Sequence, residues 1–134
     1  MDNCIFCKII KGEMPSYKIY ENDKVYAFLD ISKDYYGHTL VVPKCHCVNI
    51  LDCPKDYLDA VIEATQLISN HYVKECGFDG VNVLNASGES AEQSVMHLHF
   101  HIIPRKSNDG LHTYPARENQ GYDMEAILEH LKLK

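Results

Sequence analysis

Three histidines alternate with three apolar residues in one short run of the chain, His97-Leu98-His99-Phe100-His101-Ile102. An alternation of period two is typical of a β-strand that is buried on one face. The pattern predicts a strand over residues 95–103, with all three imidazoles on one face and the apolar side chains on the other. Imidazole can act as a nucleophile, a proton donor or a metal ligand near neutral pH. We therefore expect the chemistry of the protein to take place on this strand.

Two kinds of chemistry fit such a row of imidazoles. In the first, the middle ring, His99, attacks an electrophilic phosphorus and forms a covalent intermediate while neighbouring groups move protons. In the second, two or three of the rings hold a metal ion, which activates water for hydrolysis. A solvated edge strand without any chemistry is the third interpretation, and the pattern alone does not separate the three.

The composition restricts the class of protein. The chain has 134 residues, of which 46% are hydrophobic, and this suits one globular domain with a real core. A net charge of −6 and the lack of a basic block argue against a nucleic-acid polymer as the main partner. Neither an apolar run long enough for a membrane span nor a secretion signal is recognised in the sequence. We therefore expect a cytoplasmic protein whose six cysteines are reduced thiols or metal ligands.

The remaining patterns predict an α+β domain with mostly antiparallel strands. One long helix is expected to start at Pro54, which suits the first helical position, and to end at Gly77. Its apolar positions recur at helical spacing: Leu58, Val61, Ile62, Thr65, Ile68 and Tyr72. The other expected elements are strands over 17–20, 25–29, 38–42 and 81–84, a loop over 85–93, and short helices over 4–10 and 124–131.

Cys4 and Cys7 are separated by two residues, which is the spacing of half a zinc site. Two more ligands would be needed, and Cys45, His46, Cys47 and the histidine strand are the candidates. Alternation would put Cys45 and Cys47 on one face with His46 opposite. Two simple buried thiols at positions 4 and 7 are the alternative.

Four segments of the chain resemble the histidine triad (HIT) family of nucleotide hydrolases and transferases, and in particular its Hint branch. They are residues 4–15, 27–31, 37–44 and 93–105, so the resemblance runs from Cys4 to about Arg105. It implies a HIT-like fold with a five-stranded antiparallel sheet, one long helix and short terminal helices, paired in a two-fold homodimer. We expect a single domain over 1–134, in which residues 106–134 form a C-terminal extension of the matched part.

The resemblance also implies roles for individual residues near the phosphate. His99 matches the nucleophile and His101 matches the histidine that contacts the phosphate. Ser94 matches a serine that assists the leaving group, and His38 matches a further histidine of the same network.

The nucleotide-binding residues implied by the resemblance lie in three places. Asp30 matches the residue that binds the ribose hydroxyls, and a carboxylate can accept both hydrogen bonds. By their own chemistry, Asn85 and Gln93 in the loop before the histidine strand would offer neutral hydrogen bonds to the phosphate, and an ordinary polar loop is the alternative. Glu92 stands where relatives usually have glycine, so backbone strain and repulsion of the phosphate are expected there. The cleft for the base would be formed by Ile5, Phe6, Ile9, Phe28 and Ile31.

Relatives of the bacterial type bind zinc, and their ligands match Cys4, Cys7, His46 and His97. A closed tetrahedral site of this kind would be structural. The resemblance thus implies a nucleotide hydrolase or nucleoside phosphoramidase, which attacks the α-phosphate of a purine nucleotide such as AMP or GMP. A diadenosine polyphosphate hydrolase and a zinc-binding regulatory module with weak activity are the alternatives.

Overall fold

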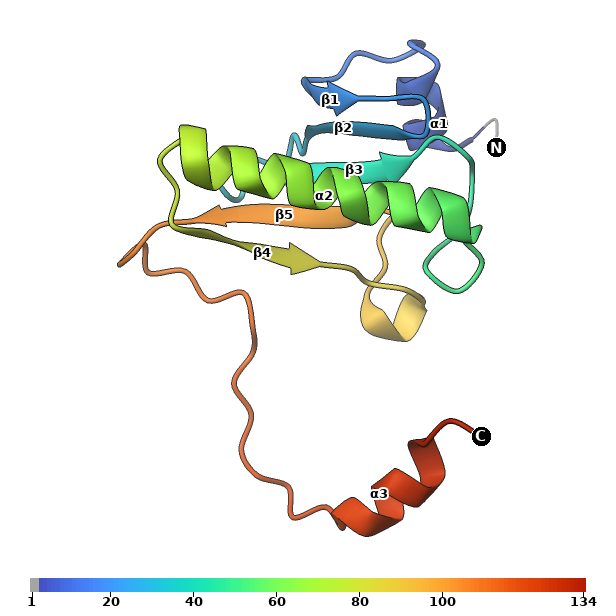
Figure 1. The fold of residues 1–134 in the computed structure, drawn as a ribbon, viewed down its shortest axis with the longest axis vertical. Coiled ribbons are helices and arrows are strands. Elements are labelled where there is room, and N and C mark those ends of the chain that lie inside the picture. Colours follow the sequence, from blue (N-terminus) through green and yellow to red (C-terminus); the bar gives the residue numbers. More distant parts are fainter. Residues whose placement is uncertain (1–2) are drawn as a thin grey trace.

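A computed structural model describes residues 3–134, so the first two residues of the expected domain lie outside the described residues. One antiparallel sheet contains five strands in the order β1-β2-β3-β5-β4. The α+β class and the five-stranded sheet expected from the sequence are confirmed. Figure 1 shows the long helix α2 lying across one face of the sheet. The elements are α1 (Ile5–Ile10), β1 (Lys18–Glu21), β2 (Val25–Leu29), β3 (Thr39–Pro43), α2 (Lys55–Glu75), β4 (Gly80–Leu84), a short 3-10 turn (Glu89–Ala91), β5 (Phe100–Arg105) and α3 (Met124–Leu131).

The sheet has a core on each face, because the side chains of its central strands alternate. On the α2 face, Val41 of β3 lies beside Phe100 of β5 and packs with the apolar side of the helix. On the other face, Leu40 lies beside His101, and the core there includes Phe6 and Ile9 of α1. The second face therefore carries a polar site next to an apolar core.

The long helix differs in two details from the expectation. Pro54 is the N-cap residue and not the first helical residue, because its ψ of 140° is extended. Ile62 was expected on the apolar side, but it is 48% exposed. Its neighbour Val61 is fully buried and takes that place in the core.

The histidine strand begins later than the sequence predicts. The strand was expected over residues 95–103, but β5 starts at Phe100, so only His101 of the three histidines lies within it. The pairing of β5 with β3 starts only at Phe100, and the N–H of Leu98 instead donates to the carbonyl oxygen of Cys47 at 2.9 Å. The alternation of faces nevertheless extends to residue 98, because Leu98, Phe100 and Ile102 all belong to the core under α2.

A tight turn at Gly37 precedes β3. Gly37 has a φ of +76°, and a Cβ built on it would lie 2.9 Å from Cγ of Pro104 in β5. Only glycine combines this backbone conformation with such a close approach. The next residue, His38, is buried and lies directly before β3, which begins at Thr39 and not at His38 as expected.

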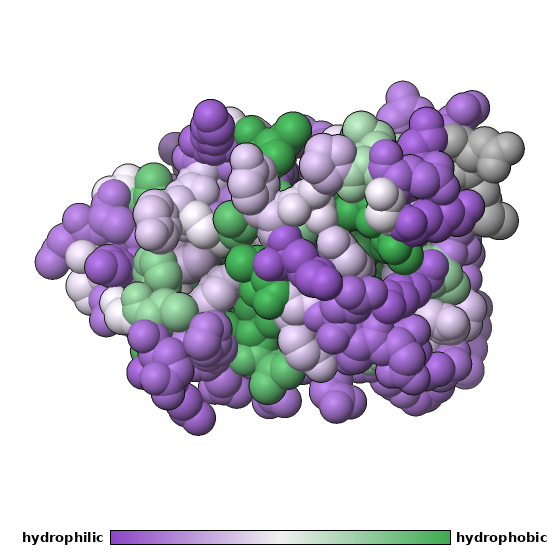
Figure 2. All heavy atoms as spheres, turned by 90° about the horizontal axis from the view of Figure 1, so that it is seen from above, coloured by the Kyte–Doolittle hydropathy of each residue, from purple (hydrophilic) through white to green (hydrophobic). Residues whose placement is uncertain are grey.

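The chain leaves the sheet after β5 and follows an extended path to α3, which lies apart from the five strands (Figure 1). None of the residues of α3 is buried. Within residues 3–134, no helix is both long enough and apolar enough to cross a membrane. Figure 2 looks down on the β1 edge, where a band of apolar atoms crosses a surface that is otherwise mostly hydrophilic.

Candidate active site and metal site

A pocket of about 550 Å³ opens on the α1 face of the sheet. Its apolar wall contains all five residues expected to form the base cleft, and Asp30, Ser94, His99 and His101 supply its polar groups. The two parts of the predicted nucleotide site therefore lie in one cavity. The lining residues are Ile5, Phe6, Ile9, Met14, Pro15, Ser16, Tyr17, Phe28, Leu29, Asp30, Ile31, Leu40, Ser94, Val95, His99 and His101.

The ring of His99 is held in one orientation. Its Nδ1 lies 2.7 Å from the carbonyl oxygen of His97. A carbonyl only accepts hydrogen bonds, so Nδ1 carries the proton and Nε2 keeps a free electron pair. Phe6 presses edge-on against the ring at 5.2 Å between centroids. Burial lowers the pKa of His99, which keeps the imidazole neutral at pH 7.

His101 lies beside His99 and is joined to a third imidazole. The two ring centroids are 4.9 Å apart, and His101 Nδ1 lies 2.8 Å from Nε2 of His38. Burial, reinforced by the rings of His99 and His38, lowers the pKa of His101 to about 4. The structure therefore brings His38, His99 and His101 together as the sequence implied.

Two carboxylates flank His38 on the side away from His101. Asp34 Oδ1 lies 2.8 Å from His38 Nδ1, whereas Asp30 Oδ2 lies at 3.7 Å from the same nitrogen. Asp30 lines the pocket, but Asp34 does not. Asp34 is not among the residues predicted from the sequence, although it lies only four residues before His38.

Asn85 and Gln93 do not line the pocket, in contrast to the expectation that they bind the nucleotide. The amide of Asn85 donates to the carbonyl oxygen of His99 at 3.0 Å. The side chain of Gln93 is buried, donating to the carbonyl oxygens of Val48 and Val95 and accepting from the N–H of Gly88. Both side chains hold the backbone around the site in place.

Ser94 and Glu92 lie at the end of this loop. Ser94 is exposed and lines the pocket, as expected for a group near the leaving group. Glu92 has a φ of 68° and a ψ of 35°, the left-handed conformation that the comparison with glycine suggested. Its side chain is exposed.

Four further residues form a compact cluster behind the pocket: Cys4, Cys7, His46 and His97, whose ligand atoms all lie within 4.8 Å of one another. Nδ1 of His97 lies 3.2 Å from Sγ of Cys4, and Nδ1 of His46 lies 3.4 Å from Sγ of Cys7. The four predicted zinc ligands are thus brought together from three parts of the chain.

The donor set fits a zinc ion. Nε2 of His97 donates to the carbonyl oxygen of Pro43 at 2.9 Å, which leaves the electron pair of Nδ1 facing the thiols. Two thiols and two imidazoles are the usual donors of closed zinc sites. Burial, followed by the nearby Cys4, raises the pKa of the Cys7 thiol to about 11 in the metal-free chain. A zinc ion would stabilise the thiolate form.

Cys45 and Cys47 are not part of this cluster. They pack with Cys53 against the core under α2, while His46 between them turns to Cys7. The alternation expected from the sequence is therefore observed here. Burial raises the pKa of the Cys47 thiol, so it is a packing residue in the protonated form.

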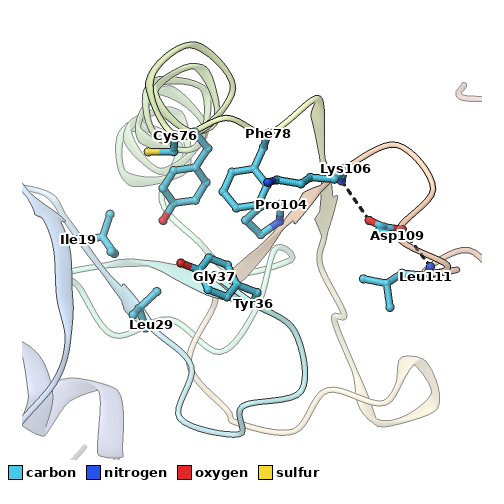
Figure 3. Close-up of a pocket in the computed structure, with 11 residues that line it drawn as sticks. Ile19, Leu29, Tyr36, Gly37, Cys76, Phe78, Pro104, Lys106, Asp109 and Leu111 are labelled. Carbon is cyan, nitrogen blue, oxygen red and sulfur yellow. Dashed lines mark hydrogen bonds between the residues drawn. The ribbon is translucent and has the colours of Figure 1, made fainter.

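A second hollow, of about 710 Å³, lies at the C-terminal end of α2 (Figure 3). Its walls are mainly apolar and include Tyr36, Phe78, Pro104 and Leu111. Asp109 accepts there from the backbone N–H groups of Lys106 and Leu111. No histidine or acidic pair lines this hollow, so its size does not make it a candidate for the chemistry.

Comparison with known proteins gives a consistent result. A family model described as "HIT domain" matches residues 11–108. The adenosine 5'-monophosphoramidase of Saccharomyces cerevisiae is 42% identical over 117 residues, covering 86% of this chain and 72% of the relative.

Two solved structures share the architecture. One is a HIT family protein from Bacillus subtilis, with a TM-score of 0.82 and 39% identity, covering 98% of this chain and 99% of the other. The other is a zinc-bound histidine triad family protein from Mycobacterium smegmatis, with a TM-score of 0.78 and 33% identity. This second comparison covers 87% of this chain and 85% of the other.

Proposed function

This chain belongs to the HIT family, and from that premise we propose that it is a nucleotide hydrolase that attacks the α-phosphate of a purine nucleotide. The substrate class that fits best is a nucleoside phosphoramidate. The phosphoramidase activity named for the yeast relative supports this choice. The observation that carries the proposal is the oriented ring of His99 at the polar end of an apolar pocket.

The proposed reaction proceeds through a covalent nucleotidyl-histidine intermediate. Nε2 of His99 attacks the α-phosphorus, the bond from phosphorus to the leaving amine breaks, and the amine departs with the bonding electrons and takes up a proton. Water then attacks the same phosphorus and breaks the bond to Nε2, which returns the neutral imidazole. The hydrogen bond from Nδ1 to the carbonyl oxygen of His97 supports this role, because it keeps the attacking nitrogen unprotonated.

The surrounding groups would serve the phosphate and the leaving group. His101 would contact a phosphate oxygen through Nε2, because Nδ1 faces His38. Ser94, at the mouth of the pocket, would assist the leaving group. In this assignment His99 acts only as the nucleophile, while His101 and Ser94 supply the hydrogen bonds to the phosphate and the leaving group.

The rest of the pocket would hold the nucleoside. Oδ2 of Asp30 faces the ribose hydroxyls in this proposal, while Oδ1 accepts from the N–H of Ser32. The base would lie among the apolar side chains of Ile5, Phe6, Ile9, Phe28 and Ile31. This wall offers shape and apolar contact, which suits a planar purine ring.

We propose that zinc bound by Cys4, Cys7, His46 and His97 is structural. All four protein donors face one another, which leaves no open position for water or substrate. Stripping zinc with a chelator should therefore leave the intrinsic reactivity of His99 in the folded fraction. Loss of that reactivity in protein that is still folded would instead favour catalysis by a metal-bound water. Because the site needs two reduced thiols, we expect the protein to act in the cytosol.

We also propose that the protein acts as a homodimer. β4 is an edge strand of the sheet, and Val83 on it is 43% exposed. Ile62 and Leu67 on the neighbouring helix are about half exposed as well. These apolar groups would be covered by a second copy of the chain. Light scattering coupled to size-exclusion chromatography should give twice the mass of the chain, and a monomer at micromolar concentration would contradict the proposal.

The function is tested by incubation with adenosine 5'-phosphoramidate. We expect release of AMP by the wild type and a loss of at least about a thousandfold in His99→Ala, because a nucleophile and its partners act as one unit. Quenching a rapid reaction with an alkaline denaturant, in which a phosphorus–histidine bond survives, should trap AMP on the wild type but not on this variant. Normal turnover by a folded His99→Ala variant would contradict the assignment. Faster cleavage of a diadenosine polyphosphate would change the substrate class and leave the chemistry intact.

A further inference from the structure

Asp34 extends the row of histidines by one charged residue. The row runs from the pocket outwards, from His101 to His38 and then to Asp34, and both links are 2.8 Å long. The loop that carries Asp34 bends sharply just before it, because Lys33 has a φ of 60°. A residue with a Cβ adopts this left-handed conformation only under strain. The carboxylate that follows this bend lies within hydrogen-bond distance of Nδ1 of His38.

When the ring of His38 is neutral, the hydrogen bonds of this row point in one direction. Partial burial disfavours the charged form of Asp34, but hydrogen bonds from His38 and Ser32 outweigh it and hold its pKa below the ordinary value. An ionised carboxylate only accepts hydrogen bonds, so Nδ1 of His38 carries the proton. In the neutral ring, Nε2 of His38 is then an acceptor, and Nδ1 of His101 must donate to it.

We propose that Asp34 is a positioning residue, which fixes the proton positions of His38 and His101 and offsets the positive charge that His101 carries when it donates to the phosphate. This inference rests on the proposed function. The orientation leaves Nε2 of His101 as the nitrogen available to the pocket. When a proton joins Nε2, the charge is shared along the row and ends opposite the carboxylate of Asp34.

Asp30 does not replace Asp34 in this role. It lies farther from Nδ1 of His38, at 3.7 Å, and it lines the pocket. With Asp34 holding the imidazole, the carboxylate of Asp30 is available for the ribose. In this proposal Asp30 binds the substrate, whereas Asp34 holds the ring of His38.

The contact also differs from an ordinary surface ion pair. The side chain of His38 is only 8% exposed, and its ring lies between Tyr35 and His101. Surface ion pairs contribute little to stability. Here the hydrogen bond selects which nitrogen of a buried ring carries the proton, so its effect should appear in kinetics and not in folding.

The test compares Asp34→Asn and Asp34→Glu with the wild type. Asparagine removes the charge and can also donate, so it allows the wrong tautomer of His38. With adenosine 5'-phosphoramidate we expect Asp34→Asn to lower kcat by roughly 10- to 100-fold, as for other orienting partners of histidine, with KM within about threefold. Asp34→Glu should recover most of the rate, because the carboxylate lies in an exposed loop. Asp23→Asn is the matched control, since it removes an exposed charge from another loop.

The pH dependence of kcat distinguishes a positioning role of Asp34 from a purely structural one, because loss of a structural contact would not shift it. The titratable groups facing His101 are His99 before β5, and Asp30, Asp34 and His38 in the segment before β3. Removing the negative charge of Asp34 lowers the pKa of the His38–His101 pair, because the protonated pair loses a favourable charge interaction. The alkaline limb of kcat should therefore move to lower pH by about half a unit or more in Asp34→Asn, and should stay in place in Asp23→Asn.

Nitrogen NMR of the imidazoles tests the inference without any turnover. In the wild type we expect protonated Nδ1 and unprotonated Nε2 on His38, and a changed tautomer in Asp34→Asn. Unchanged tautomers and kinetics in that variant would overturn the inference, and so would failure of Asp34→Glu to recover rate while still folded. If the wild type cleaves no phosphoramidate, the proposed function fails, whereas the tautomers of His38 still decide the orienting role of Asp34.

Discussion

At the scale of single residues, Glu92 combines a strained backbone with a negative charge beside the proposed phosphate site. Its backbone is left-handed in the folded chain, so we expect the strain to lower the stability of the fold. We expect Glu92→Gly to raise the free energy of unfolding by about 0.5–1 kcal/mol. It should also raise the affinity for AMP by about two- to fourfold at low salt, an effect that high salt removes.

Glu92→Ala separates these two effects. It removes the charge but keeps a Cβ, so it should reproduce the gain in affinity without the gain in stability. Urea denaturation and AMP titration at two salt concentrations measure both quantities. Equal stability of the glycine and alanine variants would show that the left-handed conformation carries no strain.

The sequence predicted individual residues best where a motif fixed their neighbours. The resemblance identified the cleft from Ile5 to Ile31 and the four zinc ligands, and the structure brings each set together. Asn85 and Gln93 differ, because side-chain amides that reach a ligand and amides that tie loops together look alike in sequence. Asp34 was missed since its role depends on a bend at Lys33, which no periodicity reveals.

At the scale of the elements, the turn before β3 decides where His38 lies. Gly37→Ala meets Pro104 at 2.9 Å and also strains the backbone. We expect a loss of about 2–5 kcal/mol in the free energy of unfolding, from about 1–2 for strain and 1–3 for crowding. Gly12→Ala is a matched control, because Gly12 has a similar φ of +79° but nothing within 4 Å of a new Cβ. It should show the strain alone, and equal losses in the two variants would contradict this account.

The proposed zinc site joins α1 to the segments before α2 and β5. Since α1 supplies Ile5, Phe6 and Ile9 to the pocket, losing the metal should both destabilise the fold and weaken nucleotide binding. Cys7→Ser should remove most of a zinc content of about one ion per chain. It should also lower Tm by about 10 °C or more, as a loss of a few kcal/mol would.

Cys76→Ser is the control for this experiment, because Cys76 is an exposed thiol outside the cluster. Elemental analysis, thermal denaturation and AMP titration measure the three effects. A Cys7→Ser protein that keeps its zinc would contradict the ligand set.

Periodicity predicted where the helices and strands lie, but it did not predict the residues at which they begin and end. The sheet and the long helix appear where apolar spacing predicted them. The start of β5 was misplaced because alternation reports which face a side chain occupies and not whether the backbone is paired. The faces already alternate from Leu98 onwards, but the N–H of Leu98 is bonded to a loop and not to a strand.

At the scale of the whole molecule, the buried neutral histidines make folding sensitive to acid. The pKa of His101 is about 4 in the folded chain and near 6.5 when unfolded. Between these values the unfolded chain binds the extra proton, so stability is full above pH 6.5 and falls as the pH drops towards 4. The slope for one such group is up to about 1.4 kcal/mol per pH unit. His101→Gln should therefore lose less stability over this range, and equal slopes for both proteins would contradict the assignment.

The alternation around the histidines has a consequence for how this protein can change over evolutionary time. Leu98, Phe100 and Ile102 fill the core, while His99 and His101 face the pocket. Inserting or deleting one residue within this segment would exchange the two sets, placing imidazoles in the core and large apolar groups against the phosphate. Substitution can therefore tune this segment, but a change in its length cannot be accommodated. The tail beyond β5 is not under this constraint, because the helix at its end buries no residue.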